Sequence, residues 1–579
     1  MTRILGISAF YHDSAAVLLA DGEIVAALQE ERFSRRKHDS GFPRRAISAC
    51  LNLGACRISE VDFVVFYEKP FLKFERILET HLRNSPYSWR SFLKALPVWL
   101  KDKLWTKDNL QKELDYDGPL FFSEHHEAHA ASAFYPSPFR RAAILTVDGV
   151  GEWTTTALGR GEDHRIALEE EIRFPDSLGL LYATFTYYLG FKVNSDEYKV
   201  MGLAPYGQPR YAQRILDELI ELAPDGAFRL NPSYFEFETG LKMASERFCR
   251  LWGRPPRKPE EPLETFHRDL AASIQRVTEE AVLRTARRLH EYTGESCLCL
   301  SGGVALNCVA NGRILRESPF KDVWIQPASG DAGGALGAAL AVWHRFLDRE
   351  RPSTGGNRDR QQGSLLGTSY SEAEIEAMLR RMGAVYERRS SESVIEETAS
   401  SLAAGKIVGW FQGRMEYGPR ALGNRSILAD PRRKEMLDEV NLRIKYRESF
   451  RPFAPAVLEE AVSDWFDIDR PSPYMLIVAP VRPGKRSQIP AVTHVDGSAR
   501  IQTVARRSNP LFYDLLETFA QRTGCPVLLN TSFNVRGEPI VESPIDAFRC
   551  FMRTRLDLLV MGPFLLWKDA QPTGLEKEA

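Results

Sequence analysis

The first residues of the chain alternate between apolar runs and turn signals. The run ILGIS comes first, and the runs AAVLLA and EIVAALQEE follow on either side of Asp21 and Gly22. An Asp-Gly pair between two apolar runs is a strong signal for a β-hairpin. The pattern therefore predicts a β-sheet that starts at the beginning of the chain.

Further along, short apolar runs alternate with longer periodic segments. Residues 84–115 are rich in Trp, Leu and Lys, and they predict helices inserted as a cap on one side of the fold. LFFSE and AAILTVDGV predict strands, with EHHEAHAASAF as a short helix between them. SCLCLSGGVALNCVANGRI and VWIQPASGDAGGALGAALAVW each have the order strand, glycine turn, helix. This order is typical of an α/β fold.

The apolar periodicity is lost between Glu350 and Ser364, where ERPSTGGNRDRQQGS has the composition of a surface linker. We place the domain boundary there, giving domains of residues 1–355 and 356–579. Beyond it, VIEETASSLAAGKIVGWFQGRMEYGPRALGNRS runs from an amphipathic helix into a buried strand and a polar loop, and PVLLNTSFNVRGEP repeats the step from strand to loop. Such loops at strand ends commonly bind ligands in open α/β sheets.

Size and composition fit a globular enzyme of two domains or more. The chain has 579 residues, of which 44% are apolar and 26% charged. Its 76 basic and 77 acidic side chains leave a net charge of −1, which removes the broad attraction typical of proteins that bind nucleic acid or anionic membranes. The opening residues lack a secretory signal pattern, and no run approaches the span of a bilayer. We expect a cytoplasmic protein with no nucleic-acid or membrane partner, and with any anion site local.

Two histidines and two aspartates form a candidate metal site. His125 and His129 are four residues apart on a predicted helix, so both imidazoles can face one ion. That spacing alone is weak, and the stretch is not the HExxH motif of zinc proteases. Asp148, at the end of the strand AAILTVDGV, and Asp331, in the loop SGDAGG, strengthen the case because each stands beside glycines, although an Asp beside Gly is also a common turn residue. Nitrogen and oxygen ligands suit iron, zinc or manganese.

Basic and polar side chains are concentrated in the loops of the second half. Arg420 and Arg425 stand among Gly, Pro, Asn and Ser rather than on an amphipathic stripe. This setting favours a clamp for phosphate or carboxylate oxygens over a solvated charged face or a nucleic-acid patch. The other candidates for the same anion site are Lys445, Arg451, Arg500, Asn530 and Ser532.

The chain resembles the O-carbamoyltransferases that act on nodulation factors, cephalosporins, aminoglycosides and other natural products. The resemblance runs over nearly the whole length, through motifs that stand in the same order. These motifs are YHDSAA with EERFSRRKH, the HxExH stretch, VDGVGEWTT, EYKVMGLAPYG, LSGGVALNC, GDAGGALGAA, EYGPRALGNRSILADP, KYRESFRPFAP and LLNTSFNVRGEPIV.

The resemblance implies a fold and an activity. The fold is an N-terminal domain of the actin and sugar-kinase ATPase type, like that of threonylcarbamoyl transferases, followed by a YrdC-like α/β domain. The second domain turns carbamoyl phosphate and ATP into carbamoyl adenylate. The first domain transfers the carbamoyl group to a hydroxyl of a small-molecule acceptor, such as a sugar, an aminosugar or a polyketide. The resemblance is also compatible with a homodimer.

The resemblance also implies roles for residues. His125, His129, Asp148 and Asp331 become ligands of a divalent metal, expected to be Fe(II), and His12 becomes the catalytic histidine, with Lys37 near the transfer site. The groups that handle carbamoyl phosphate and ATP become Arg420, Arg425, Lys445, Arg451, Arg500 and Ser532. The adenylate lies against glycine turns and their neighbours, namely Gly302, Gly303, Asn307 and Gly330.

This chemistry is physically reasonable. Nitrogen lone-pair donation deactivates a carbamoyl carbon, so an adenylate leaving group and a metal would supply the missing electrophilicity. His12, with an ordinary pKa of about 6.5, could take the acceptor's hydroxyl proton, although it could also be a buried hydrogen-bonding residue. Glycine turns offer N–H groups to phosphate. The alternative functions are a threonylcarbamoyl transferase acting on tRNA, which would need a basic surface, and an inactive nucleotide-binding protein.

Overall fold

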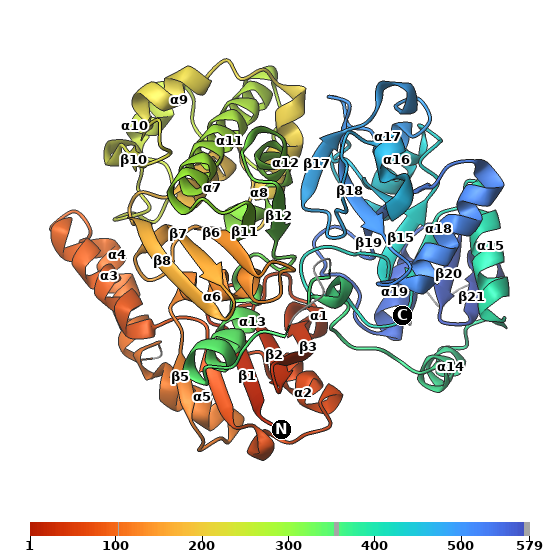
Figure 1. Ribbon diagram of the computed structural model, residues 1–579. Helices are drawn as coiled ribbons and strands as arrows, with labels where there is room; N and C mark the ends of the chain where they lie inside the picture. Colours follow the sequence, from red (N-terminus) through yellow and green to blue (C-terminus); the bar gives the residue numbers. More distant parts are fainter. Residues whose placement is uncertain (102, 353–357, 573–579) are drawn as a thin grey trace. The chain divides into compact units, whose positions relative to one another are not determined.

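The computed structural model describes residues 1–101, 103–352 and 358–572. It separates into two compact units (Figure 1). The first unit is Met1–Ala27 with Ser40–Arg360, and the second is Leu28–Asp39 with Gln361–Ala579. Part of the predicted linker, residues 353–357, lies outside the described residues. None of the described helices is long and apolar enough to cross a membrane.

The first unit begins with the predicted sheet. Its strand order is β3-β2-β1-β4-β5, and β3 follows β2 directly across Asp21 and Gly22, which confirms the hairpin. β2 pairs antiparallel with β1, whereas β4 and β5 continue the sheet in parallel. These strands are β1 (Arg3–Ser8), β2 (Ala15–Ala20), β3 (Glu23–Gln29), β4 (Phe63–Phe66) and β5 (Leu120–Phe122).

A second five-stranded sheet in the same unit repeats this arrangement. Its order is β12-β11-β6-β7-β8, with β7 antiparallel to β6 and with β11 and β12 parallel to it. The strands are β6 (Arg141–Val147), β7 (Thr154–Glu162), β8 (Arg165–Arg173), β11 (Cys297–Ser301) and β12 (Asp322–Ile325). The same order in both sheets is the duplicated topology of the actin and sugar-kinase ATPase fold, as the resemblance implied.

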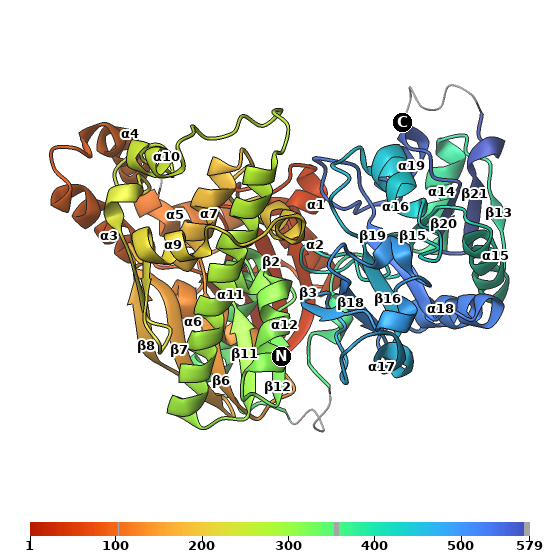
Figure 2. The same ribbon diagram turned by 90° about the horizontal axis from the view of Figure 1, so that it is seen from above.

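Helices cover these sheets, and a separate pair of short strands, β9 (Ile220–Leu222) and β10 (Phe228–Leu230), lies beside them. The longest helix is α11 (Thr265–Thr293) (Figure 2). The others are α2 (Arg44–Leu53), α3 (Pro70–Arg83), α4 (Trp89–Lys101), α5 (Thr106–Leu114), α6 (His125–Phe134), α7 (Leu178–Tyr188), α8 (Glu197–Leu203), α9 (Ala212–Glu218), α10 (Glu246–Trp252), α12 (Cys308–Glu317) and α13 (Asp331–Ala341).

The close approach of α6 and α13 depends on small residues. α13 has the sequence DAGGALGAALA, and it packs against both α6 and β1. A Cβ atom added to Gly337 would overlap the main-chain carbonyl of Ala128 on α6. Only glycine fits at this crossing because the two backbones touch there. The run of small residues therefore determines how near the side chains of α6 lie to the start of α13.

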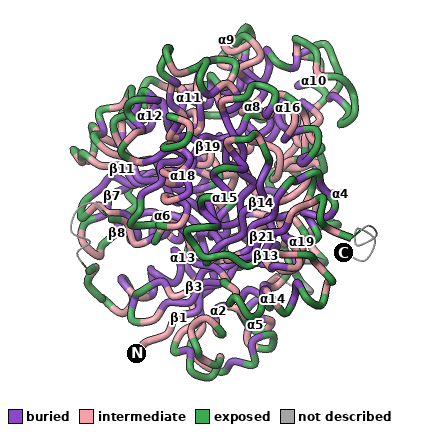
Figure 3. Tube along the Cα trace, turned by 90° about the vertical axis from the view of Figure 1, so that its right-hand side faces the viewer, coloured by how far each residue is buried: buried purple, intermediate pink, exposed green. Residues whose placement is uncertain are grey.

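The second unit is built on one mixed sheet of nine strands. The order is β13-β21-β20-β14-β15-β19-β16-β18-β17, with parallel pairs β14–β20 and β16–β18. The central strands form the buried core of this unit (Figure 3). The strands are β13 (Glu387–Arg388), β14 (Val408–Phe411), β15 (Arg425–Ala429), β16 (Ala454–Leu458), β17 (Ile477–Pro480), β18 (Ser498–Val504), β19 (Val527–Ser532), β20 (Leu558–Met561) and β21 (Phe564–Trp567).

Helices from both ends of the chain pack on this sheet. α15 packs on α18, and both contact strands of the sheet. The short helix α1 (Glu31–Ser34), near the N-terminus, belongs to the same unit. The remaining helices are α14 (Glu372–Arg381), α15 (Ser391–Ala403), α16 (Met436–Glu439), α17 (Val462–Trp465), α18 (Pro510–Thr523) and α19 (Pro544–Arg553).

Candidate metal centre and anion-binding loops

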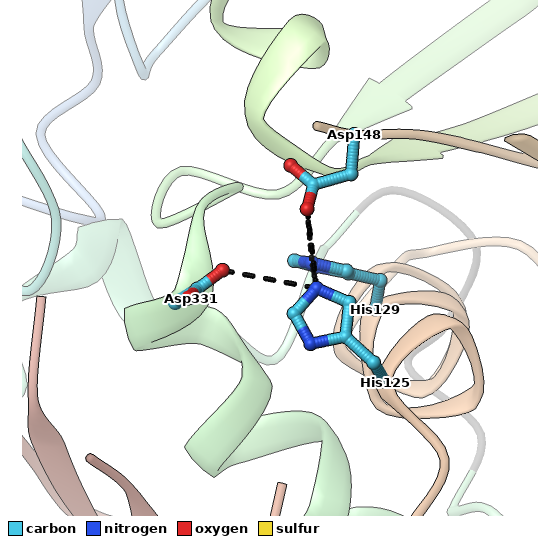
Figure 4. Close-up of side chains that lie close together, drawn as sticks. All are labelled: His125, His129, Asp148 and Asp331. Atoms are coloured by element: carbon cyan, nitrogen blue, oxygen red, sulfur yellow. Dashed lines mark hydrogen bonds and ion pairs between the residues drawn. The ribbon is translucent and has the colours of Figure 1, made fainter. Parts of the chain in front are cut away.

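The four predicted metal ligands meet in the first unit (Figure 4). His125 and His129 come from α6, Asp148 follows β6, and Asp331 begins α13. Each residue contributes one ligand atom, and these atoms all lie within 4.8 Å of one another. The two histidines of the HxxxH stretch, Asp148 and Asp331 thus converge, although they are separated by up to 206 residues along the chain.

The geometry of this cluster suits a metal ion. The Nε2 atoms of His125 and His129 are 3.0 Å apart, and His125 Nε2 is 3.1 Å from a carboxylate oxygen of Asp148. Two ligands about 2.1 Å from one ion lie roughly 3 to 4.2 Å apart, so these atoms are close to ligand spacing. The longer separation between His125 and Asp331 is 3.8 Å. Two imidazoles and two carboxylates fit iron, zinc or manganese.

The histidines and carboxylates of the cluster shift one another's pKa values. Burial opposes the charged form of His125, but the hydrogen bond to Asp148 and the nearby carboxylates raise its pKa to about 9. Burial and the neighbouring charge of His125 lower the pKa of His129 well below its ordinary value. Burial raises the pKa of Asp331. A divalent cation would replace the proton on His125 and leave both imidazoles neutral, as metal binding requires.

The surrounding residues orient these ligands. Tyr67 donates its hydroxyl hydrogen to Asp331 over 3.3 Å, and Ser301 Oγ lies 3.4 Å from Nδ1 of His129. Within the described residues the buried Nδ1 of His125 has no hydrogen-bond partner. Hydroxyl and carbonyl partners of this kind fix the tautomer and the angle of metal-bound histidines. Tyr67 and Ser301 were not predicted, because nothing in the sequence ties either of them to the HxxxH stretch.

His12 lies at the edge of the same cluster. Its Nδ1 is 3.2 Å from a carboxylate oxygen of Asp13 and 3.8 Å from one of Asp331, and its ring lies 4.5 Å from that of Tyr11. Burial lowers the pKa of His12, but Asp331 and Asp13 outweigh it and raise the pKa well above the ordinary value. With Nδ1 directed to carboxylates, Nε2 is the ring nitrogen left for an incoming group.

The predicted glycine turns lie beside the metal ligands. Gly302 has a φ of 95°, which favours glycine, and the N–H of Gly303 donates to Asp148 over 2.7 Å. Gly330 is the N-cap residue of α13, directly before Asp331. The Asn307 side chain caps α12 and bonds Gln275, so its amide is already engaged. The Gly303 turn therefore supports the carboxylate of Asp148, and Gly330 places Asp331 at the start of α13.

Lys37 and His12 are assigned to different units of the chain. Lys37 belongs to the Leu28–Asp39 segment, which packs with the second unit, whereas His12 belongs to the first. The Lys37 side chain is half-buried. The structure does not bring Lys37 and His12 together within one unit.

The second unit holds a buried lysine among neutral oxygens. The ammonium group of Lys445 donates to the main-chain carbonyl of Ser532, to its hydroxyl over 3.3 Å, and to Asn534. The Asn534 side-chain oxygen is 2.8 Å from Nζ. Burial lowers the pKa of Lys445 well below its ordinary value, and Arg447 and Arg451 lower it further. The structure thus joins two predicted residues, Lys445 and Ser532, and adds Asn534, which stands two positions after Ser532.

Hydrogen bonds to Glu416 hold the loop that carries Arg420. Glu416 Oε1 accepts the main-chain N–H groups of Leu422 and Asn424 over 2.7 and 2.8 Å and, more weakly, that of Arg425. Arg420 itself is half-buried, between these anchored residues and Pro419. Glu416 was not predicted as a functional residue, because its role depends on the folded loop rather than on a motif.

Arg425 is placed differently from Arg420. Its guanidinium is fully buried, lies 3.7 Å from the Phe411 ring, and donates to main-chain carbonyls of Gln412, Gly413 and Asn424. Burial lowers the pKa of Arg425 to about 10. The carbonyls occupy its donors, so Arg425 holds the loop together, and an anion would have to displace them to reach it.

The remaining predicted residues lie on β18 and β19 or just before β16. Asn530 on β19 donates to Gln502 over 2.7 Å, and Gln502 donates to the carbonyl of Leu422 over 2.7 Å. The side-chain oxygen of Asn530 is buried and has no hydrogen-bond partner within the described residues. Arg500 lies on β18, half-buried, and Arg451 lies 3.6 Å from Glu448. Strands β18 and β19 thus connect the Asn530 amide to the Arg420 loop.

Residues from the N-terminal segment also hold this loop, which no sequence motif indicates. Arg32 on α1 donates to the carbonyl of Gly418 over 2.7 Å, and Gln29 accepts the N–H of Gly418. Arg35 donates to the carbonyl of Ile540 over 2.7 Å. In the sequence ERFSRRKH these arginines look like a solvated charge run, because their partners lie hundreds of residues away.

Together the fold and the first cluster define a class: a protein built on the actin and sugar-kinase ATPase fold, with four buried or half-buried side chains that could hold a divalent ion. Comparison with known families gives the particular family. The family model for the carbamoyltransferase N-terminus matches residues 3–340, and that for the carbamoyltransferase C-terminus matches residues 399–568. The chain belongs to the carbamoyltransferase family and is a carbamoyltransferase enzyme.

Its relatives match it over nearly the whole length. The uncharacterized protein sll1178 of Synechocystis is 56% identical, over 99% of this chain and 98% of the relative. Nodulation protein NolNO of Sinorhizobium fredii is 40% identical, over 96% of this chain and 79% of its own length. Nodulation protein U of Rhizobium tropici is 31% identical, over 92% and 91%. Among solved structures, HypF of T. kodakarensis overlaps 60% of this chain and 48% of its own, at 14% identity and a TM-score of 0.33.

Proposed function

We propose that this enzyme is an ATP-dependent O-carbamoyltransferase. It converts carbamoyl phosphate and ATP into carbamoyl adenylate and passes the carbamoyl group to a hydroxyl of a small molecule, such as a sugar, an aminosugar or a polyketide. Family membership supports the carbamoyl transfer. The use of ATP and the adenylate rest on the resemblance of the motifs and on the two clusters of polar residues.

The observation that carries the proposal is the environment of Lys445. Its ammonium group is buried and bonded to neutral oxygens of Ser532 and Asn534, with no ion pair to a carboxylate among the described residues. Arg447 and Arg451 add positive charge nearby. Burying a cation without a counter-charge is costly. A bound phosphate would supply that charge and the acceptor oxygens, which favours a phosphorylated substrate at this site.

The adenylation proceeds in two steps. Water releases inorganic phosphate from carbamoyl phosphate and leaves carbamate. An oxygen of carbamate then attacks the α-phosphorus of ATP, the bond to the pyrophosphate breaks, and carbamoyl adenylate forms. Lys445 and Arg420 would hold the anionic groups, and the unpartnered Asn530 oxygen is suited to accept an N–H of the carbamoyl group.

The transfer uses the residues of the first unit. The acceptor hydroxyl attacks the carbamoyl carbon, the bond from that carbon to the adenylate oxygen breaks, and AMP leaves. In its neutral form His12 would take the hydroxyl proton at Nε2, and Asp13 and Asp331, which raise its pKa, would stabilise the resulting imidazolium. His125, His129, Asp148 and Asp331 would hold a divalent ion, and iron, zinc and manganese all suit the ligands. Such an ion supplies Lewis acidity toward the carbamoyl oxygen.

The adenylating half can be tested without an acceptor. The purified protein is mixed with carbamoyl phosphate, ATP and ferrous iron under anaerobic conditions, and pyrophosphate release is followed. We expect release that depends on carbamoyl phosphate, that is lost in Arg420→Ala, and that persists in Arg381→Ala, where the arginine is exposed on α14. The absence of release with iron, zinc and manganese alike would refute the adenylation step.

A further inference from the structure

The helices that follow β4 have one packed side and one open side. α4 packs on α3 through Phe92 against His81, with ring centroids 5.3 Å apart, and through Trp99 against Phe74 at 5.7 Å. Both helices lie at the margin of the first unit in two perpendicular views (Figures 1 and 2). The inner side of α4 is therefore accounted for by packing within the fold.

The outer side of α4 carries large apolar side chains that face solvent. Trp89, Leu93 and Leu100 are 56%, 58% and 49% exposed. Their spacing of four and seven residues puts them on one stripe of the helix. Tyr87, just before the helix, and Trp105, just after it, are also exposed. An open stripe of this kind is unusual in a protein that has no partner for it.

A row of positive charge borders this stripe. Arg90 and Lys94 each follow an exposed apolar residue by one position, and both are exposed. Residues 83–107 contain six basic side chains and one acidic side chain, in a chain whose net charge is −1. Among the described residues, Arg90, Lys94 and Lys107 form no ion pair with a carboxylate. The net charge of the whole chain does not reveal this local excess of positive charge, because acidic side chains elsewhere offset it.

We propose that α4 and the described residues flanking it, within 82–101 and 103–107, form a docking surface for an anionic lipid membrane. Trp and Leu along one stripe with Arg and Lys beside it is the pattern of a helix that lies in the lipid interface, with tryptophan at the headgroup level. Each basic residue near an anionic leaflet adds to the attraction. The earlier expectation of no membrane partner rested on the charge of the whole chain, and this surface departs from it.

Charge also argues against a second copy of the chain as the occupant. In a twofold dimer the same surface meets itself, so the Arg90 and Lys94 row of one copy would face the same row of the other. Like charges facing each other oppose association, whereas a leaflet of anionic lipids complements the row along its whole length. The apolar stripe distinguishes this surface from a purely polar anion site.

The test uses the full-length protein and lipid vesicles. Vesicles of phosphatidylcholine with 30% phosphatidylserine, a composition chosen as about one anionic lipid in three, are compared with pure phosphatidylcholine by co-sedimentation. We expect binding to the mixed vesicles alone, and loss of binding in high salt. Arg90→Gln/Lys94→Gln/Lys107→Gln should weaken the partitioning on the order of a hundredfold. Trp89→Ser/Leu93→Ser should weaken it by at least about tenfold.

A matched triple variant controls for total charge. Arg381→Gln/Lys434→Gln/Arg549→Gln removes three exposed cations from the second unit and should bind vesicles like wild type. Circular dichroism confirms that each variant is folded. Equal binding to neutral and mixed vesicles, or equal binding by the two triple variants, would overturn the proposal. A dimer in sedimentation equilibrium that dissociates in Trp89→Ser/Leu93→Ser, without vesicle binding, would show instead that the surface joins two copies.

Discussion

The crossing of α6 and α13 can be tested by adding one methyl group away from the metal ligands. In Gly337→Ala, the new Cβ would overlap the carbonyl oxygen of Ala128. The overlap is on the order of 1.5 Å relative to ordinary contact, so the two helices must move apart by about that much. Since Asp331 lies on α13 and the histidines on α6, the 3.8 Å separation between His125 and Asp331 would grow.

Metal sites tolerate far less displacement than this. Ligand distances hold to within about 0.2 Å, so Asp331 would leave the ligand set while His125, His129 and Asp148 stay together. We expect the affinity for Zn²⁺, measured by equilibrium dialysis, to fall on the order of a hundredfold. The clash should cost about 1 to 3 kcal/mol of stability, partly offset by the roughly 1 kcal/mol that alanine gains over glycine in a helix.

The control is Gly484→Ala, where an added Cβ meets nothing within 4 Å. It should leave both Zn²⁺ affinity and melting temperature unchanged. If Gly337→Ala bound Zn²⁺ as tightly as wild type, the contact between α6 and α13 would not be what sets the ligand spacing. A higher melting temperature with unchanged affinity would count against the clash itself.

Three further predictions concern the second unit and a buried histidine. Lys445→Met should remove pyrophosphate release while the protein stays folded, whereas Lys434→Met, at an exposed position, should retain it; a folded Lys445→Met that is fully active would contradict the anion site. Arg32→Ala should slow pyrophosphate release roughly 10- to 100-fold by freeing the loop it holds, and exposed Arg36→Ala should not, as stopped assays at saturating substrate will show. Burial lowers the pKa of His344 to about 4. The folded protein therefore binds fewer protons there than the unfolded chain, and stability is lost as pH falls from about 6.5 to 4. Urea unfolding at several pH values should show this loss reduced by about 2 to 3 kcal/mol in His344→Phe, and identical acid slopes would refute the assignment.

Local sequence patterns predicted many elements of the fold. The Asp21-Gly22 turn, the HxxxH spacing and the two strand, glycine turn, helix units each depend on neighbours in sequence, and the structure confirms them as elements. The motifs led us to expect that the four ligands converge. The structure shows that the small residues of α13 bring them together.

Contacts between distant residues could not be predicted in this way. The burial of Arg425 among carbonyls depends on the folded loop around it, and a guanidinium that holds a loop looks the same in sequence as one that binds an anion. The membership of α1 in the second unit depends on contacts such as Arg32 with Gly418, which no periodicity records. The exposed stripe of α4 shows a further limit, because a helical pattern indicates an apolar face without indicating what covers it.

The position of α1 has a consequence for the order of events during synthesis. Gly418 follows Arg32 by 386 residues, so the short helix leaves the ribosome long before the loop that it holds exists. At about 5 to 20 residues per second, the delay is roughly 20 to 80 s. During that time the main-chain carbonyls of Gly418 and Ile540, which accept from Arg32 and Arg35, do not yet exist, and the second unit cannot complete its fold until they do. A gene cut after residue 360 would separate them permanently, leaving a C-terminal fragment that lacks a piece of its own fold.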